Sequence, residues 1–410
     1  MELYEYARPG LMAGKTILYV HGFASSGQTG SVATLRLLLP GATVIAPDLP
    51  VEPKEAMALL RDIVSAEKPD LIIGTSMGGM YSEMLYGIDR IIVNPAFQLA
   101  DTLLKNNGLG RREFHNKRSD GETSFLVTKT LLEHFREVSL HCFEKSSEDR
   151  DRVFGLFGIH DNLVDTFGLF REHYPKAIRF DGEHHLNDSV IVHSMLPVIQ
   201  WIDDRQKGVS KPVLFISLDD RLMNHSSGMP KAVAILAQSY DLHIVSSVDY
   251  NVPGECKDVF EWCEANLGVP VWNRVTVSNH KNLLLGDYLI DADPDSFGGR
   301  DFMGTLIQFG SDAFKTWEDV LTFFSRLGVN KVEIVILSAA KNLVGGEGDS
   351  CLAADFVKDP GYCKGVVQTV VAGFEAAAFQ DVNEFTEFAK IFVRVAGNSY
   401  VLYRGTGGPT

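Results

Sequence analysis

Residues 71–80 read LIIGTSMGGM, a short apolar run followed by a serine, Ser76, that stands between small residues. A nearly continuous apolar run is typical of a strand that is covered on both faces of its sheet. Gly74 and Gly78 permit a turn that is too sharp for larger side chains, and such a turn exposes the serine hydroxyl. A helical pattern follows at 80–86. We therefore predict a strand, a sharp turn that carries Ser76, and a helix.

Short β-rich runs alternate with helix-like segments through the first half of the chain. The strand-like runs lie at 16–20, 43–49, 70–74, 90–96, 152–158 and 177–182, and the helix-like segments at 55–66, 80–86 and 164–173. This alternation predicts the α/β class, with a mainly parallel sheet and helices on both of its faces. The longer and more polar stretch 97–150 interrupts the alternation. We expect it to form an insertion, a small cap over the edge of the sheet.

The polar segment DDRQKGVSKP, residues 203–212, is the best candidate for a linker. Strand–helix alternation restarts after it, which predicts a second α/β domain with a Rossmann-like sheet. A chain of 410 residues exceeds the size of one hydrophobic core, so more than one domain is expected. We place a first α/β domain at 1–205 and the second domain at 206–328.

Residues 329–410 are left unassigned by the sequence. A strand at 331–338 and an amphipathic helix at 366–379 are expected there. Two β-rich runs flank Gly397-Asn398, which predicts a hairpin.

The overall composition excludes several functional classes. A net charge of −15 and a pI near 5.3 argue against a nucleic-acid-binding surface. No run of eighteen apolar residues is present, and the N-terminus lacks the pattern of a secretory signal, so no membrane span or export is expected. The five cysteines form no CxxC pair, which favours reduced thiols, a cytoplasmic location and no zinc or other metal site.

A nucleophilic serine requires a base, and the base requires a group that orients it. A G-x-S-x-G match is weak by itself in a chain with 37 glycines, but here it lies between a predicted strand and a predicted helix, the setting of an α/β-hydrolase nucleophile. Asp161 follows the strand-like run 152–158, and His184 and His185 follow the run 177–182. The order Ser, Asp, His at successive strand ends is that of this fold.

Each of these residues also has a simpler explanation. Asp161 could only cap the next helix, and a histidine in the polar loop GEHHLND could only be solvated. The joint occurrence of all three in order favours catalysis.

An acyl-transfer site also needs amides that stabilise an oxyanion. We expect one from Met77, which follows the nucleophile, and one from Phe23 in the loop after the first strand. Gly22 would allow close approach there, and His21 is expected to shape the loop rather than to act as the base.

The motifs ILYVHGF, IAPDLP, LIIGTSMGG and VNPAF, with GEHHLND, resemble the YqiA/YcfP-like family of α/β-hydrolase esterases over about residues 16–202. The resemblance implies serine ester hydrolysis with Ser76 as nucleophile, Asp161 as acid and His184 as base. His184 matches the histidine of the family stretch G-G-H-R-M-N-D. Glu183 and His185 replace the second glycine and the arginine of that stretch, which leaves the triad whole and alters its surroundings.

The motifs YDLHIVSSVDYN, HKNLLLGDYLIDADP and FGGRDFMGT resemble the C-type 5′(3′)-deoxyribonucleotidases of the haloacid dehalogenase superfamily, over about residues 211–328. The resemblance implies a phosphate site. Its matching residues are Ser217 at the nucleophile position, Asp219 two residues later, Ser246 or Ser247, Lys281, Asp287 and Asp291. Ala292 replaces the second of two adjacent acids, and the segment that should form the family's cap is too short.

A serine at position 217 cannot supply the carboxylate that attacks phosphorus and binds Mg²⁺. Turnover would require Asp219 or Asp220 to take over the attack. The second domain is therefore predicted to be a degenerate nucleotidase.

The leading functional prediction is an ester hydrolase that acts on a small-molecule acyl ester and requires no metal or organic cofactor. The alternatives are a nucleotide-binding regulatory protein without turnover, and a metal-dependent 5′-nucleotidase. The sequence leaves open the acyl and alcohol groups, the choice between ester and thioester, and the oligomeric state.

Overall fold

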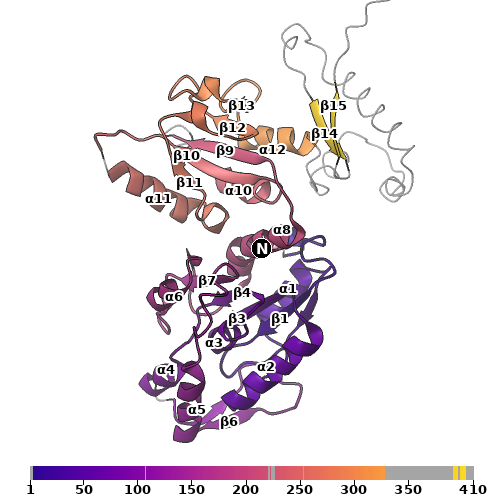
Figure 1. The fold of residues 1–410 in the computed structure, drawn as a ribbon, viewed down its shortest axis with the longest axis vertical. Helices are drawn as coiled ribbons and strands as arrows, with labels where there is room; N and C mark the ends of the chain where they lie inside the picture. Colours follow the sequence, from indigo (N-terminus) through magenta and orange to yellow (C-terminus); the bar gives the residue numbers. More distant parts are fainter. Residues whose placement is uncertain are drawn as a thin grey trace, which may run out of the picture. The chain divides into compact units, whose positions relative to one another are not determined.

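The computed structural model describes residues 3–106, 108–219, 222, 227–252, 254–327, 391–395 and 398–402 (Figure 1). The chain separates into two compact units, Met1–Lys315 and Thr316–Thr410. The first unit contains two parallel sheets. The described part of the second unit consists of α12 (Trp317–Arg326) and the antiparallel hairpin of β14 (Ile391–Val395) and β15 (Asn398–Leu402).

The first sheet has six parallel strands in the order β2-β1-β3-β4-β7-β8. The strands are β1 (Thr16–Val20), β2 (Thr43–Ile45), β3 (Leu71–Thr75), β4 (Asp89–Val93), β7 (Val153–Gly158) and β8 (Ala177–Phe180). The predicted parallel sheet is confirmed. Because all strands run in the same direction, the loops that follow β3, β7 and β8 leave the same edge of the sheet.

Helices cover both faces of this sheet because successive strand residues point to opposite sides. Leu18, Ile72 and Ile92 pack in one apolar cluster with α2 (Pro53–Glu67), α3 (Met77–Glu83) and α6 (Phe167–His173). Their neighbours in the strands, such as Ile17, Ile73 and Ile91, pack in a second cluster with α1 (Gly30–Leu38) and α8 (Leu196–Lys207). The short elements η1 (Leu3–Tyr6), α7 (Asp188–Val190) and the π-helix η2 (Ile191–Met195) complete this part of the fold.

The predicted insertion forms a small subdomain between β4 and β7. It consists of α4 (Leu99–Lys105), the antiparallel strands β5 (Gly110–Glu113) and β6 (Ser124–Val127), and α5 (Lys129–Ser139). The buried face of α5, which includes Phe135, belongs to the same apolar cluster as α2 and α3. The ring of Phe23, in the loop after β1, packs edge-on against Phe125 at 5.3 Å and Phe135 at 6.2 Å between ring centroids.

The second sheet has five parallel strands in the order β11-β10-β9-β12-β13. The strands are β9 (Val213–Leu218), β10 (Asp241–Ser246), β11 (Val275–Val277), β12 (Tyr288–Asp291) and β13 (Thr305–Gln308), with the helices α10 (Met229–Leu236) and α11 (Gly254–Asn266) and the 3-10 turns η3 (Val269–Val271), η4 (Lys281–Leu283) and η5 (Gly299–Asp301). In chain order this is the arrangement 3-2-1-4-5 of a Rossmann-like sheet. The second α/β element of the prediction is therefore present.

The predicted linker 203–212 is partly wrong. Helix α8 continues through Lys207 and ends at Gly208, whose φ of 63° is left-handed. Asp203 is buried, and its carboxylate accepts hydrogen bonds from the amide of Met12 and from Lys15. Only residues 208–212 connect α8 to β9.

The hairpin expected around Gly397-Asn398 agrees with the pairing of β14 and β15, although Gly397 itself lies outside the described residues. The strand predicted at 331–338 and the helix predicted at 366–379 also lie outside them.

A buried ionic network fixes the C-terminal end of α3. Arg90, in β4, is fully buried and donates to the carbonyl oxygen of Glu83 at 2.5 Å. It also forms an ion pair with Asp149, whose carboxylate accepts a hydrogen bond from the amide of Gly87 at 2.8 Å. A cation beside the last carbonyls of a helix is favourable, because these groups carry the negative end of the helix dipole.

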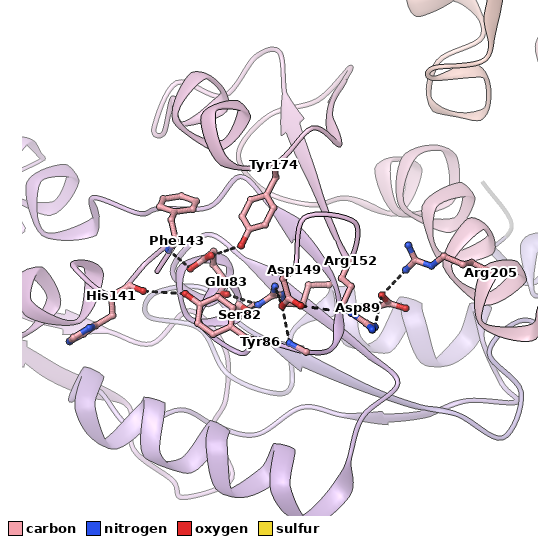
Figure 2. A network of polar contacts seen from close by, with 12 residues as sticks. Ser82, Glu83, Tyr86, Asp89, His141, Phe143, Asp149, Arg152, Tyr174 and Arg205 are labelled. Atoms are coloured by element: carbon pink, nitrogen blue, oxygen red, sulfur yellow. Dashed lines mark hydrogen bonds and ion pairs between the residues drawn. The ribbon is translucent and has the colours of Figure 1, made fainter. Parts of the chain in front are cut away.

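Glu83 is the second buried charge in this region (Figure 2). Its carboxyl group accepts hydrogen bonds from the hydroxyl of Tyr174 at 2.6 Å and from the amide of Phe143 at 2.9 Å. Burial raises the pKa of Glu83, and these hydrogen bonds act in the opposite direction. Helix α3 is thus tied to β4, to the end of α6 and to the segment that leads into β7.

Candidate active site

Ser76 lies on a strained turn between β3 and α3. Its φ and ψ are 54° and −116°, outside the regions that L-residues usually adopt. Glycines are required on both sides because the chain packs on itself here. A Cβ on Gly74 would lie 2.2 Å from the hydroxyl oxygen of Ser82, and one on Gly78 would lie 2.0 Å from the carbonyl oxygen of Val20. The turn presents a half-buried hydroxyl at the carboxyl edge of the sheet.

The Gly78→Ala substitution is expected to lower the free energy of unfolding by about 3 kcal/mol or more, because backbone atoms cannot move away as a flexible side chain can. Urea unfolding followed by circular dichroism measures the change. Gly30→Ala is the matched control, since no atom lies within 4 Å of a Cβ at this first residue of α1. Its effect should be neutral, or stabilising by up to about 1 kcal/mol. Equal stability of the two variants would contradict this account of the turn.

The structure brings Ser76, His184 and Asp161 together. Oγ of Ser76 lies 3.0 Å from Nε2 of His184, and Nδ1 of His184 lies 2.7 Å from Oδ2 of Asp161. His185, the other histidine considered, is exposed, and its ring packs edge-on against His184 at 5.4 Å between centroids. His184 is therefore the histidine that links the hydroxyl to the carboxylate.

The side chain of Asp161 is almost fully buried, with 3% of its surface exposed. Burial alone would raise its pKa. Hydrogen bonds from His184 and from the amides of Val164 and Leu163 outweigh burial, and they hold the pKa of Asp161 below its usual value of 3.8. The group therefore stays an anion through the neutral range, as an orienter of an imidazole must. The alternative role of Asp161, a cap of the following helix, is not observed, because α6 (Phe167–His173) has Thr166 as its N-cap residue and the two amides lie in the loop before it.

The two amides expected to stabilise an oxyanion, those of Phe23 and Met77, belong to the two segments next to the Ser76 side chain. The loop after β1 approaches the nucleophile so closely that a Cβ on Gly22 would lie 3.3 Å from Cβ of Ser76. Among the described residues, the amides of Phe23 and Met77 donate no hydrogen bond to another group of the chain. Met77 is also the first residue of α3, where the helix dipole favours negative charge.

His21 and Asp48 hold the loop that carries Phe23. Buried His21 contacts the carbonyl oxygen of Gly22 through Nδ1 at 2.8 Å and accepts from the amide of Leu49 through Nε2 at 3.1 Å. Burial lowers the pKa of His21, which favours the neutral ring that this pairing needs. Asp48 accepts hydrogen bonds from the amides of Gly27 and Ser119. The loop-shaping role expected for His21 agrees with these contacts.

Asp48 was not singled out from the sequence. The motif IAPDLP contains it in the loop that follows β2, and this position is the one signal that could have identified it.

Five of the six residues proposed for the second site lie in β9, β10 and β12 at their carboxyl ends, or in the loops that follow such strand ends. They are Ser217, Asp219, Ser246, Lys281 and Asp291. Internal partners occupy most of their polar groups. The ammonium group of Lys281 lies 2.7 Å from the carboxylate of Asp291, and both side chains are buried. The hydroxyl of Ser246 donates to the carbonyl oxygen of Leu218 at 3.0 Å, and Oδ1 of Asp219 accepts from the amide of Leu222.

Asp287 does not lie with the other five. Its carboxylate accepts a hydrogen bond from the amide of Val213, the first residue of β9. The reason is directional, since Asp287 precedes β12 and Asp291 ends it, and four strand residues span about 13 Å. The assignment of Asp287 to a phosphate site is therefore corrected. Asp220 lies outside the described residues, and Ser247 donates to the carbonyl oxygen of Ser278.

The described residues contain no group of three or more His, Cys, Asp or Glu side chains placed to hold a metal ion. In the same part of the chain, no helix has both the length and the apolar character needed to cross a membrane.

Comparison with known proteins separates the two halves of the chain. The "Putative 5′(3′)-deoxyribonucleotidase" of Vibrio phage KVP40 is 30% identical over 152 residues, which cover 89% of the phage protein and 30% of this chain. The chain belongs to this deoxyribonucleotidase family. The predicted nucleotidase resemblance is thereby confirmed, and a deoxyribonucleotidase-family segment accounts for about a third of the protein.

The N-terminal half of this deoxyribonucleotidase-family protein matches a different family. Residues 16–199 match the model described as "Uncharacterised protein family (UPF0227)", a YqiA-like esterase family, as the sequence predicted.

Two solved structures are similar to a little under half of the chain. One is described as that of LipS and LipT, two metagenome-derived lipolytic enzymes, with 18% identity, a TM-score of 0.35, and coverage of 46% of this chain and 94% of that one. The other is the monoacylglycerol lipase of Paleococcus ferrophilus, with 16% identity, a TM-score of 0.33 and the same coverage. These are likenesses of fold.

Proposed function

We propose that the N-terminal domain is a serine carboxylic-ester hydrolase. The observation that carries the proposal is the continuous chain of contacts from Oγ of Ser76 through the His184 ring to Asp161, at 3.0 Å and 2.7 Å. These separations lie within hydrogen-bond range and allow proton transfer between hydroxyl and imidazole.

The arrangement suggests an acyl-enzyme mechanism. Oγ of Ser76 attacks the acyl carbon while its proton passes to Nε2 of His184, and the carboxylate of Asp161 stabilises the resulting imidazolium. The amides of Phe23 and Met77 would stabilise the oxyanion of the tetrahedral intermediate. The intermediate collapses as the alcohol leaves with the proton from His184. A water molecule then repeats the sequence on the acyl-enzyme, which releases the carboxylic acid and restores Ser76. No step requires a metal or an organic cofactor.

Labelling with a fluorophosphonate tests the proposal on the full chain. We expect one adduct, mapped by mass spectrometry to the peptide that contains Ser76, and protection by a short p-nitrophenyl ester. An oxygen ester and a thioester with the same acyl group would then identify the preferred leaving group. A folded protein that takes up no label, or that carries it on another residue, would refute the assignment.

We also propose that the deoxyribonucleotidase-family domain does not hydrolyse deoxynucleotides. Ser217 provides no carboxylate, and the charge of Lys281 is neutralised by Asp291 inside the protein. We expect no release of phosphate from deoxynucleoside 5′- or 3′-monophosphates with Mg²⁺, measured on a sample whose cooperative urea unfolding demonstrates that it is folded. Clear turnover that Ser76→Ala leaves intact would overturn the proposal.

The alternative for the second domain is nucleotide binding without turnover, in a regulatory role. Thermal-shift measurements with deoxynucleotides, with and without Mg²⁺, distinguish it from a domain that binds none. A small acyl ester as substrate, a cytoplasmic location, the absence of a nucleic-acid partner and the domain boundaries remain predictions.

A further inference from the structure

Asn94 is a buried polar residue at the carboxyl end of β4, between the strands that precede the nucleophile and the acid. Only 2% of its surface is exposed. Its φ of 44° is left-handed, a conformation that asparagine tolerates better than most residues with a side chain. Neither the nucleophile nor its two partners belongs to β4, yet the segment that Asn94 begins contacts all three of their loops.

The side-chain amide of Asn94 joins the loop of the acid to the loop of the base. Its Nδ2 donates to the carbonyl oxygens of Glu183 and His184, each at 3.0 Å. Its Oδ1 accepts from the amide of Gly158, the last residue of β7, at 2.8 Å. All three hydrogen bonds are made inside the protein, where lost partners are costly to replace.

The main chain next to Asn94 holds the nucleophile. The amide of Ser76 donates to the carbonyl oxygen of Val93 at 2.9 Å, and the amide of Ala96 donates to the carbonyl oxygen of Ser76 at 3.0 Å. The hydroxyl of Thr166, beyond the acid, donates to the carbonyl oxygen of Pro95 at 2.8 Å. Residues 93–96 therefore contact the nucleophile from one side and the acid and base loops from the other.

The acid and base loops also touch each other without free space. A Cβ on Gly158 would lie 2.5 Å from the carbonyl oxygen of Gly182 and 2.7 Å from that of Glu183. Backbone contact thus sets the separation of the acid loop from the base loop. That contact does not set the distance from these two loops to Ser76. The amide of Asn94 is placed to fix that distance.

We infer that Asn94 is a positioning residue, which holds His184 and Asp161 in register with Ser76 and touches no reacting atom. The inference rests on the proposed ester hydrolysis. Loss of the Asn94 side chain leaves the nucleophile, the base and the acid present but no longer fixes the distances between them. Displacements of about 1 Å at such a site cost up to about 100-fold in rate.

Asn94→Gly is the informative variant, because glycine accepts the left-handed backbone while all three side-chain hydrogen bonds disappear. Asn94→Asp is the second variant. It keeps the shape and the acceptor for Gly158 but cannot make both donations to the base loop. Asn273→Gly is the control, since exposed Asn273 also has a left-handed φ of 57° and lies in the second half of the chain.

For both Asn94 variants we expect kcat for a p-nitrophenyl ester to fall by about 10- to 100-fold with KM little changed. The rate of fluorophosphonate labelling of Ser76 should fall by the same factor. Asn273→Gly should alter neither. Urea unfolding of each variant separates these effects from a loss of folded protein.

A double-mutant cycle distinguishes positioning from a general structural role. If Asn94 acts through His184, adding Asn94→Gly to His184→Ala should change the residual labelling rate by less than about 2-fold. A loss that persists at its full size without His184, or unchanged kcat in both Asn94 variants, would overturn the inference. A wild-type protein that carries no label on Ser76 would instead refute the proposed hydrolysis, and the inference with it.

Discussion

Ser76→Ala should lower kcat for short p-nitrophenyl esters by about 10⁴- to 10⁶-fold, because the acyl-enzyme of the proposed mechanism forms on this hydroxyl. Alanine keeps a Cβ, so the strain of the turn stays the same and stability should not change. The rate is measured at saturating ester, and the fold by urea unfolding. Ser189→Ala, at an exposed position of the short helix α7, is the matched control and should retain full activity.

Residual activity near the wild-type level in a well-folded Ser76→Ala protein would exclude the serine mechanism. In that case the hydrolysis would have to come from another site. Activity that disappears together with cooperative unfolding would show only that the protein had lost its fold, and the unfolding curve separates these outcomes.

Arg90→Met should lower the free energy of unfolding by about 3–5 kcal/mol, the cost of removing one partner of a buried ion pair. The carboxylate of Asp149 would retain only the amide of Gly87 and the half-exposed guanidinium of Arg152, 3.8 Å away, and the carbonyl oxygen of Glu83 would lose its donor. Urea unfolding at neutral pH measures the change.

Arg136→Met provides the comparison for Arg90→Met. Arg136 pairs with Asp101, and about half of each side chain is exposed, so its loss should cost at most about 1 kcal/mol. Adding Asp149→Leu to Arg90→Met should recover part of the stability, because the uncompensated charge is then absent. Equal costs for the two arginine variants would show that burial of the Arg90 pair is not what makes it important.

The fold of the first sheet and the order of its catalytic candidates could be predicted from the sequence because both follow from local signals. Apolar runs mark the strands, and the loops after parallel strands must meet at one edge. Ser76, Asp161 and His184 each stand directly after such a run. The choice of His184 over His185 could not come from spacing, since adjacent residues in a loop differ only in where the folded chain points them.

Residues whose role depends on contacts with distant parts of the chain could not be predicted from the sequence. Asp203 belongs to a charged segment that resembles a linker, yet its partner Lys15 is supplied by the start of the chain. Asn94 precedes a proline at a strand end, which predicts a turn and gives no sign of three loops meeting there. Asp287 is different, because its position before a strand already placed it at the wrong edge for a phosphate site.

The aromatic contacts of Phe23 with Phe125 and Phe135 mean that the loop after β1, which carries one of the amides proposed to bind the oxyanion, packs against the insertion. Substitutions at Phe125 are therefore expected to shift this loop, because its ring lies directly against that of Phe23, while the contacts of Ser76 with His184 and of His184 with Asp161 involve no residue of the insertion.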